Sequence, residues 1–252
     1  MRYGFIAAMC VLIACSCASK SKQLKGVDKI IDISAARKRK EVTYDNARKV
    51  LKEYSAEFTI PNPLFGKSTT NYRRIDPSHQ ASIICRAVLL DKFSTEADIQ
   101  VRCRADSLDE QRCSAFREEY IEKHIREGMF RIRLSLESGF SDKSMDPDLW
   151  AIYIENAKGI MIEPDDIVAA GIGAARDSVY SAYQRMRYPR NVMRREITLY
   201  FKRNTFFGQD LFGGENPYII FVMSRERKTL ARVAWNLTSG AGSLIESKDS
   251  SQ

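Results

Sequence analysis

The residues with the clearest chemistry lie near the start of the chain, where a cysteine follows a short apolar run. Leu12-Ile13-Ala14-Cys15 places a small residue directly before a thiol, which is the pattern of a bacterial lipoprotein signal. Arg2 supplies the positive charge that precedes such a run, and Tyr3 to Ile13 supply the apolar stretch. We therefore expect residues 1–14 to be removed and the thiol of Cys15 to carry acyl chains.

Other interpretations of this segment fit less well. A membrane-spanning helix needs about 20 apolar residues, whereas the uncharged run from Tyr3 to Ser19 is shorter and ends in polar residues. An ordinary cleaved secretory signal has the same charged and apolar regions, but the residues ending at Cys15 fit a lipoprotein signal without adjustment. Cleavage before Cys17 would place Ala14 where a branched aliphatic residue is favoured.

The sequence thus predicts an extracytoplasmic protein that lipid holds to a membrane. In many Gram-negative lipoproteins, an aspartate directly after the modified cysteine signals retention in the inner membrane. Ser16 stands at that position in this chain. This favours the outer membrane if the source is Gram-negative.

The formal net charge of +8 is concentrated beside the expected lipid anchor. Segment 15–40 holds eight Lys and Arg residues against two Asp residues, whereas the body from Glu41 onward is close to neutral. We expect residues 15–40 to form a flexible basic tether, in which residues 20–40 face anionic lipid headgroups. The alternative is a solvated charged linker. Because the charge lies in this segment, a nucleic-acid partner is not expected.

Cysteine and histidine usage bears on disulfides and metals. Cys17, Cys85, Cys103 and Cys113 remain once the signal and the lipid are accounted for, and an extracytoplasmic compartment permits disulfides. The chain has no Cys-x-x-Cys pair, and its two histidines are isolated in the sequence. We therefore expect no structural zinc site, no other metal and no cofactor.

The densest basic cluster of the body is a candidate for anion binding. It contains two tyrosines, Tyr183 and Tyr188, and the five arginines Arg185, Arg187, Arg190, Arg194 and Arg195. Guanidinium groups bind phosphates and carboxylates with two parallel hydrogen bonds, so an envelope polymer or an acidic protein is a conceivable ligand. The alternative, which we favour at this point, is a solvated helix end and loop.

Other groups that could do chemistry lack the required spacing. Glu163, Asp165 and Asp166 bring three carboxylates together without the glycine and further ligands of a calcium loop. Gly171-Ile172-Gly173 lacks the third glycine of a dinucleotide-binding turn. The chain has no Gly-x-Ser-x-Gly elbow, and its histidines give little material for a catalytic triad. We therefore expect no enzymatic activity.

The hydropathy pattern divides the body at about residue 128. Residues 41–128 are expected to be mainly helical, with a helix over 43–54, a strand over 80–90 and a helix over 107–126. Ser107 and Glu110 fit a capping box at the start of the last of these helices. Residues 94–105 are ambiguous, because their apolar residues alternate as in a strand while their composition suits a helix.

Residues 129–238 have the period-two alternation of half-buried strands. The expected strands cover 130–136, 150–154, 160–162, 197–201, 218–223 and 230–237. A connecting helix is expected over 174–187. Short strands at short intervals favour an antiparallel sandwich. Residues 239–252 are rich in Gly and Ser and are expected to be a disordered tail.

Several segments carry a resemblance to a known group of proteins: Phe130–Leu134, Leu149–Ile154, Ile162–Ile167, Ile197–Phe201 and Ala234-Trp235. Residues 128–237 resemble the C-terminal part of bacterial lipoproteins that have an immunoglobulin-like β-sandwich and no assigned activity. The resemblance implies an α+β fold in which an N-terminal strand and a helical hairpin pack on the sandwich. For this reason we prefer a helix over residues 94–105. The resemblance supplies no catalytic residues.

A disulfide between Cys103 and Cys113 depends on that hairpin. If residues 95–105 and 108–126 are antiparallel helices, the two thiols lie at matching heights on either side of the turn at Leu108. If residues 95–105 form a strand instead, Cys85 becomes the natural partner of Cys103. The third alternative is that all three cysteines are buried thiols.

These observations lead to three hypotheses about function. We favour a lipid-anchored, non-catalytic envelope module that binds or scaffolds an envelope protein or polymer. The second is a protein that handles lipid or envelope polymer in an apolar cleft. The third, a hydrolase with an unrecognised site, would need perturbed carboxylates or a buried Ser–His pair.

Overall fold

The computed structural model describes residues 24–33, 36, 41–63, 82–138, 142–156, 159–181, 186–204 and 218–237, with the backbone alone at 142, 174–181 and 186–192. Within these residues the chain has a mixed α+β fold with two β-sheets and three α-helices. The predicted α+β class is therefore confirmed at this level. The expected tail at 239–252 and the lipidation site lie outside the described residues.

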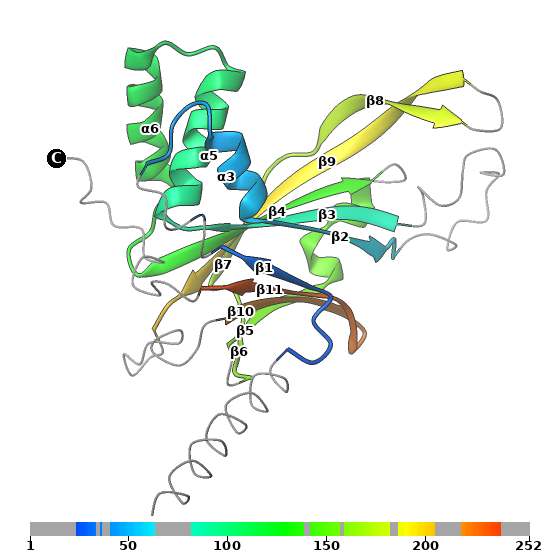
Figure 1. The fold of residues 1–252 in the computed structure, drawn as a ribbon. Helices are drawn as coiled ribbons and strands as arrows, with labels where there is room; N and C mark the ends of the chain where they lie inside the picture. Colours follow the sequence, from blue (N-terminus) through cyan, green and yellow to red (C-terminus); the bar gives the residue numbers. More distant parts are fainter. Residues whose placement is uncertain are drawn as a thin grey trace, which may run out of the picture.

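Two sheets form the body of the protein (Figure 1). Sheet A consists, in spatial order, of β1 (Lys29–Asp32), β11 (Lys228–Asn236), β10 (Tyr218–Arg225), β5 (Ala151–Asn156) and β6 (Met161–Ile162). Sheet B has the order β2 (Ser55–Pro61), β3 (Ser82–Leu90), β4 (Met129–Ser138), β9 (Met186–Lys202) and β7 (Asp166–Ala169), and β8 (Gly173–Ser181) also pairs with β9. The described pairings are antiparallel except that of β1 with β11.

The main core lies between the two sheets. Phe130, Ile132, Leu134 and Leu136 of β4 are fully buried, as their predicted alternation requires, and share one cluster with side chains of sheet A. Trp235 belongs to the same cluster, and its indole N–H donates to the carbonyl of Tyr54, 2.9 Å away. Burying this much apolar surface is the dominant favourable term in folding.

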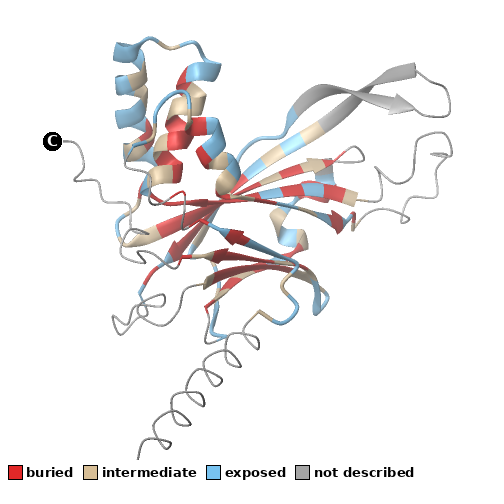
Figure 2. Ribbon diagram, in the orientation of Figure 1, coloured by how far each residue is buried: buried red, intermediate tan, exposed pale blue. Residues whose placement is uncertain are grey.

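The helices cover the opposite side of sheet B (Figures 1 and 2). They are α3 (Ala47–Glu53), α5 (Lys92–Ala105) and α6 (Glu110–His124), and the short 3₁₀ turns η1 (Asp142–Met145) and η2 (Pro147–Leu149) follow β4. Helix α5 begins at Asp91, whose carboxylate accepts from the backbone N–H of Phe93 and Ser94, each at 3.0 Å. This N-cap satisfies two of the donors that a helix start leaves unpaired. The ambiguous segment is therefore a helix.

The start of the second helix differs from the prediction. Its N-cap is Asp109 and not Ser107. The carboxylate of Asp109 accepts from the backbone N–H of Arg112 at 2.8 Å. Ser107 has a φ of +53°, in the left-handed region, because it lies in the turn that follows α5. An N-cap residue instead adopts an extended backbone, so the expected capping box is wrong.

The segment expected to be a flexible tether contributes to the sheet. Residues 29–32 form β1, and both Ile31 and Ile33 are buried in the main core. Local composition is basic here, but pairing with β11 allows Ile31 and Ile33 to be buried in the core. Strand pairing also crosses the division expected at residue 128. Strand β3 pairs with β4 over seven positions, from Ile84 with Glu137 to Leu90 with Arg131.

A helix was expected over residues 174–187, and this prediction is wrong. Residues 173–181 form β8, and β9 begins at Met186. The alanines of this segment favour a helix by intrinsic propensity, but β9 offers a continuous ladder of backbone partners. Tertiary pairing commonly overrides weak local preference. Strands β2 and β7 were also missed. Strand β2 ends at Pro61, a residue that breaks regular structure, and β7 has only four residues and follows Pro164.

Candidate functional site

The feature of the fold that most resembles a binding element is a two-stranded arm formed by β8 and β9. Strand β4 pairs with β9 only from Met193 to Lys202. Strand β7 pairs with β9 within this same stretch. Among the described strands, Met186–Val192 pairs with β8 alone. The arm therefore extends beyond the sheet, as Figure 1 shows in yellow. Its seven residues of β9 span about 23 Å at the usual rise of a strand.

The composition of this arm suits an interface. Segment 173–193 contains four arginines, three tyrosines and one aspartate. The strand register pairs Tyr180 with Arg187 and Asp177 with Arg190. Tyrosine and arginine are the side chains most enriched at the energetic centres of protein interfaces. A two-stranded ribbon is only marginally stable alone in water, so this arm gains most from a partner that covers it.

Two of the predicted arginines contact neighbouring segments at the base of the arm. Nε of Arg194 donates to Oε2 of Glu137 at 2.9 Å, across the pair that β9 forms with β4. Nε of Arg195 donates to the carbonyl of Ala170, and Nη1 donates to that of Met145, each at 3.3 Å. These two guanidinium groups therefore anchor the arm.

The described part of the chain places four of the five predicted arginines along strand β9 and not at a helix end. Arg194 and Arg195 lie at the base of the arm, whereas Arg187 and Arg190 lie on its β9 strand and Arg185 is outside the described residues. The expected helix end is itself absent, because this segment forms strands. The anion-binding hypothesis therefore moves from a compact cluster to an extended ribbon.

The helical hairpin holds the predicted pair of cysteines together. Sγ of Cys103 and Sγ of Cys113 are 2.10 Å apart as a disulfide, with a Cα–Cα distance of 5.5 Å. This is the first of the three alternatives considered from the sequence. Cys85 is the free cysteine of the described residues, and burial raises the pKa of its thiol far above the ordinary value.

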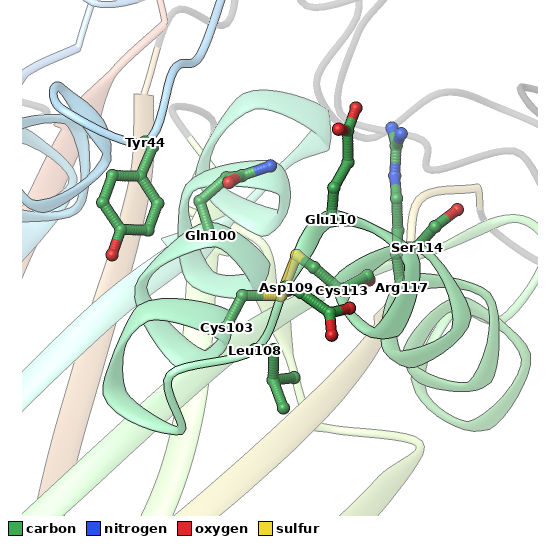
Figure 3. Close-up of a pocket in the computed structure, with 9 residues that line it drawn as sticks. All are labelled: Tyr44, Gln100, Cys103, Leu108, Asp109, Glu110, Cys113, Ser114 and Arg117. Carbon is green, nitrogen blue, oxygen red and sulfur yellow. Dashed lines mark hydrogen bonds between the residues drawn. A yellow bond between two sulfur atoms is a disulfide. The ribbon is translucent and has the colours of Figure 1, made fainter.

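A cavity of about 450 Å³ lies beside this disulfide (Figure 3). It is bounded by the segment before α3, by both helices of the hairpin and by the turn between them. The lining residues are Tyr44, Gln100, Cys103, Leu108, Asp109, Glu110, Cys113, Ser114 and Arg117. Much of this lining is polar, which does not favour the apolar-cleft hypothesis.

Several polar groups of this cavity are already engaged within the protein. Arg117 forms an ion pair with Glu96 at 2.9 Å, and Gln100 donates to the same carboxylate at 3.1 Å. Asp109 caps α6, and the ring of Tyr44 lies 4.6 Å from the guanidinium carbon of Arg104. The cavity therefore supports a ligand less well than the arm supports a partner.

A buried charge network joins the helices to sheet B. Oδ2 of Asp98 accepts from Nη1 of Arg133 at 2.6 Å, from Nε of Arg102 at 3.1 Å and from the hydroxyl of Tyr120 at 2.9 Å. The neighbouring Arg131 donates to Oγ1 of Thr95 at 2.9 Å. Sequence reasoning missed this network, because arginines that alternate with apolar residues along a strand are typical of a solvated face.

The electrostatics of this network fit a structural role. Burial raises the pKa of Asp98, but the charges of Arg133 and Arg102 outweigh burial, so the pKa is below its ordinary value. Burial and the nearby carboxylate raise the pKa of Tyr120 to about 12. Burial, with the charge of Arg131, lowers the pKa of His124, whose ring lies 4.6 Å from that of Tyr120. A catalytic acid would need a raised carboxyl pKa, which Asp98 does not have.

The acidic turn before β7 is also held by ion pairs. Asp165 contacts Nζ of Lys202 at 2.7 Å and accepts from the backbone N–H of the same residue at 3.0 Å. Asp166 pairs with Arg126 at 2.7 Å. Within the part of the chain that the structure describes, no group of three His, Cys, Asp or Glu side chains is placed to hold a metal ion.

Comparisons with known proteins provide no functional assignment for this chain. No family model, no curated protein and no solved structure matches this chain. None of the described helices is long and apolar enough to cross a membrane.

Proposed function

We propose that this chain is a lipid-anchored, extracytoplasmic protein whose β8–β9 arm binds an acidic surface of another envelope protein, without catalysis. The observation that carries the proposal is the arm itself, a ribbon that leaves the sheet at Met193 and bears arginines and tyrosines. The predicted acylation of Cys15 supplies the location. The disulfide between Cys103 and Cys113 supports the location, because such bonds persist in oxidising compartments.

The rest of the fold suits a scaffold for such an arm. Two facing sheets around one core support the proposed immunoglobulin-like relationship, and they give the arm a rigid base at Arg194 and Arg195. Binding elements are commonly carried by connecting segments that a rigid scaffold positions. An apolar-cleft protein is the second hypothesis, and the polar lining of the described cavity gives it less support.

Site-specific photo-crosslinking in intact cells tests the proposal. A photoreactive amino acid at position 180 of the full lipoprotein should give a discrete protein adduct, whereas the same group at Gln111, exposed on α6, should not. The double change Arg187→Ser and Arg190→Ser should reduce the position-180 adduct, because it removes the cations that would recognise the acidic partner. The matched control Arg112→Ser, on the exposed face of α6, should leave the adduct unchanged.

Two results would contradict this function. One is the absence of an adduct at position 180 in protein that is anchored and abundant. The other is an adduct to an envelope polymer and not to a protein, which would replace the proposed partner with an anionic polymer.

A further inference from the structure

Sheet A has an outer face, turned away from sheet B, that carries an unusual row of side chains. The strand register places one residue from each of the five strands in this row: Ile30, Ala234, Ile220, Glu155 and Met161. The two ends of the row lie on the edge strands, where Ile30 is 52% exposed and Met161 is 62% exposed. Exposed aliphatic side chains thus flank the middle of the outer face on both edges.

The first described segment of the chain, which contains Leu24 and Val27, covers the middle of this outer face. Leu24 and Val27 pack on a small cluster formed by Ile220, Val222 and Ala234. Arg232 fastens the segment, since its backbone N–H donates to Oδ2 of Asp28 at 2.7 Å and its carbonyl accepts from the N–H of Asp28 at 2.7 Å. The chain therefore enters the fold across the outer face of sheet A.

The length of chain between this entry point and the lipid limits how the protein can sit on a membrane. Leu24 is nine residues after Cys15, and nine residues reach at most about 30 Å in any conformation. In Figure 1, sheet B lies above sheet A, and the helices lie above sheet B. Stacked sheets are about 10 Å apart, so the outer face of sheet A is the closest of these layers to the lipid.

Charge and hydropathy at this face match a lipid surface. Lys25 is exposed beside the entry point, and Lys20 and Lys22 precede it in the sequence. Basic residues beside an anchor are attracted to anionic headgroups. Ile160, which precedes Met161 in the sequence, is also exposed (47%). Aliphatic side chains gain free energy by entering the boundary between headgroups and acyl chains.

We propose that the outer face of sheet A rests on the anionic lipid surface to which Cys15 is anchored, with Ile30 and Met161 at headgroup depth. This inference rests on the proposed lipidation. The docked orientation turns the helical layer of sheet B away from the bilayer. The occupant of the two exposed edges of this face is thus a lipid surface and not a second protein.

Quenching by labelled lipids tests this orientation. The full lipoprotein, with Cys17→Ser to remove a competing thiol, is reconstituted in vesicles of phosphatidylethanolamine and phosphatidylglycerol that contain a headgroup spin label. A fluorophore is attached at Met161→Cys, at Ile30→Cys or, as a matched control, at Glu118→Cys on the exposed face of α6. Probes at positions 161 and 30 should be quenched several-fold more strongly than the probe at position 118.

The outcomes separate this inference from the proposed function. Acyl label on Cys15 is measured in the same samples. If Cys15 is acylated but all three probes are quenched equally weakly, the docking of sheet A is refuted while the lipid anchor stands. A further outcome is a position-161 probe that escapes quenching by lipid and becomes more shielded from solvent as the protein density rises. That result would assign the face to contact with a second copy of the chain and would also refute docking on lipid. Loss of the acyl label would refute the proposed anchor.

Discussion

Arg133 and Asp98 form a buried ion pair that crosses from sheet B to helix α5, with Nη1 2.6 Å from Oδ2. Their side chains are only 11% and 4% exposed, so neither charge is well solvated. A buried charge is tolerated when it is paired and hydrogen-bonded. Here Tyr120 and Arg102 supply the further contacts of the carboxylate. The pair therefore determines how the helical layer sits on the sheet.

Removing the charge of Asp98 should destabilise the fold. Asp98→Asn leaves the guanidinium of Arg133 buried without its counter-ion, and breaking a buried pair in this way costs about 3–5 kcal/mol. The matched control is Glu57→Gln, which breaks the exposed pair with Arg86 and should cost less than about 1 kcal/mol. Urea denaturation of both variants measures the difference. Equal costs for the two variants would contradict a structural role for Asp98.

The same carboxylate should make stability depend on pH on the acid side. Because the folded-state pKa of Asp98 is below its ordinary value of 3.8, the unfolded state binds a proton first as the pH falls. Stability from this group is therefore fully present above the ordinary pKa, and it is lost as the pH falls through the folded pKa. Denaturation curves in this acid range should show a steeper loss for the native chain than for Asp98→Asn. Parallel slopes for the two proteins would refute the assignment.

Loss of the disulfide should loosen the helical hairpin. Cys103 and Cys113 are ten residues apart, and closing a loop of this size stabilises a fold by up to about 3 kcal/mol. Cys103→Ser with Cys113→Ser should lose stability on this scale and should accelerate amide exchange in α6. This helix packs on α5 through a small cluster in which Tyr120 is its one buried residue among those described. Free thiols at both positions in oxidised native protein would contradict the bridge.

The structure also changes which basic residues are expected to matter at the membrane. In the sequence, Lys20, Lys22 and Lys25 stand between Cys15 and β1, whereas residues 37–40 stand between β1 and α3, which lies in the helical layer. Changing the three lysines to Gln should reduce the quenching of a position-161 probe on anionic vesicles, most clearly at low salt. Changing residues 37–40 to Gln should have a smaller effect. A larger effect at residues 37–40 would restore the expectation of one continuous basic tether.

Much of the sheet could be predicted because side-chain alternation is a strong local signal. Phe130 to Leu136 alternate with polar residues, and the structure buries each of these apolar side chains. The charged run from Arg225 to Lys228 separates two apolar segments and marks the turn between β10 and β11, in which Glu226 and Arg227 have positive φ. Cys103 and Cys113 could be paired because a helical hairpin brings equidistant positions on either side of its turn together.

The remaining features depend on long-range contacts. Arg131 and Arg133 look solvated along β4, and only the arrival of α5 with Asp98 and Thr95 buries them. Residues 173–181 have helical composition and become a strand because β9 pairs with them. Residues 29–32 look like tether and become a strand because β11 has a free edge. The pairing of β8 with β9 also explains why the predicted arginines lie along a strand and not at a helix end.

Mass spectrometry of the mature N-terminal peptide tests the central claim most directly, since the proposed location and the docked face both depend on it. The account predicts a peptide that begins at Cys15 and carries a diacylglyceryl group on the thiol. In Cys15→Ser, this acylated peptide should be absent and the precursor should retain residues 1–14. An unmodified Cys15, or acylation at Cys17 instead, would contradict the account.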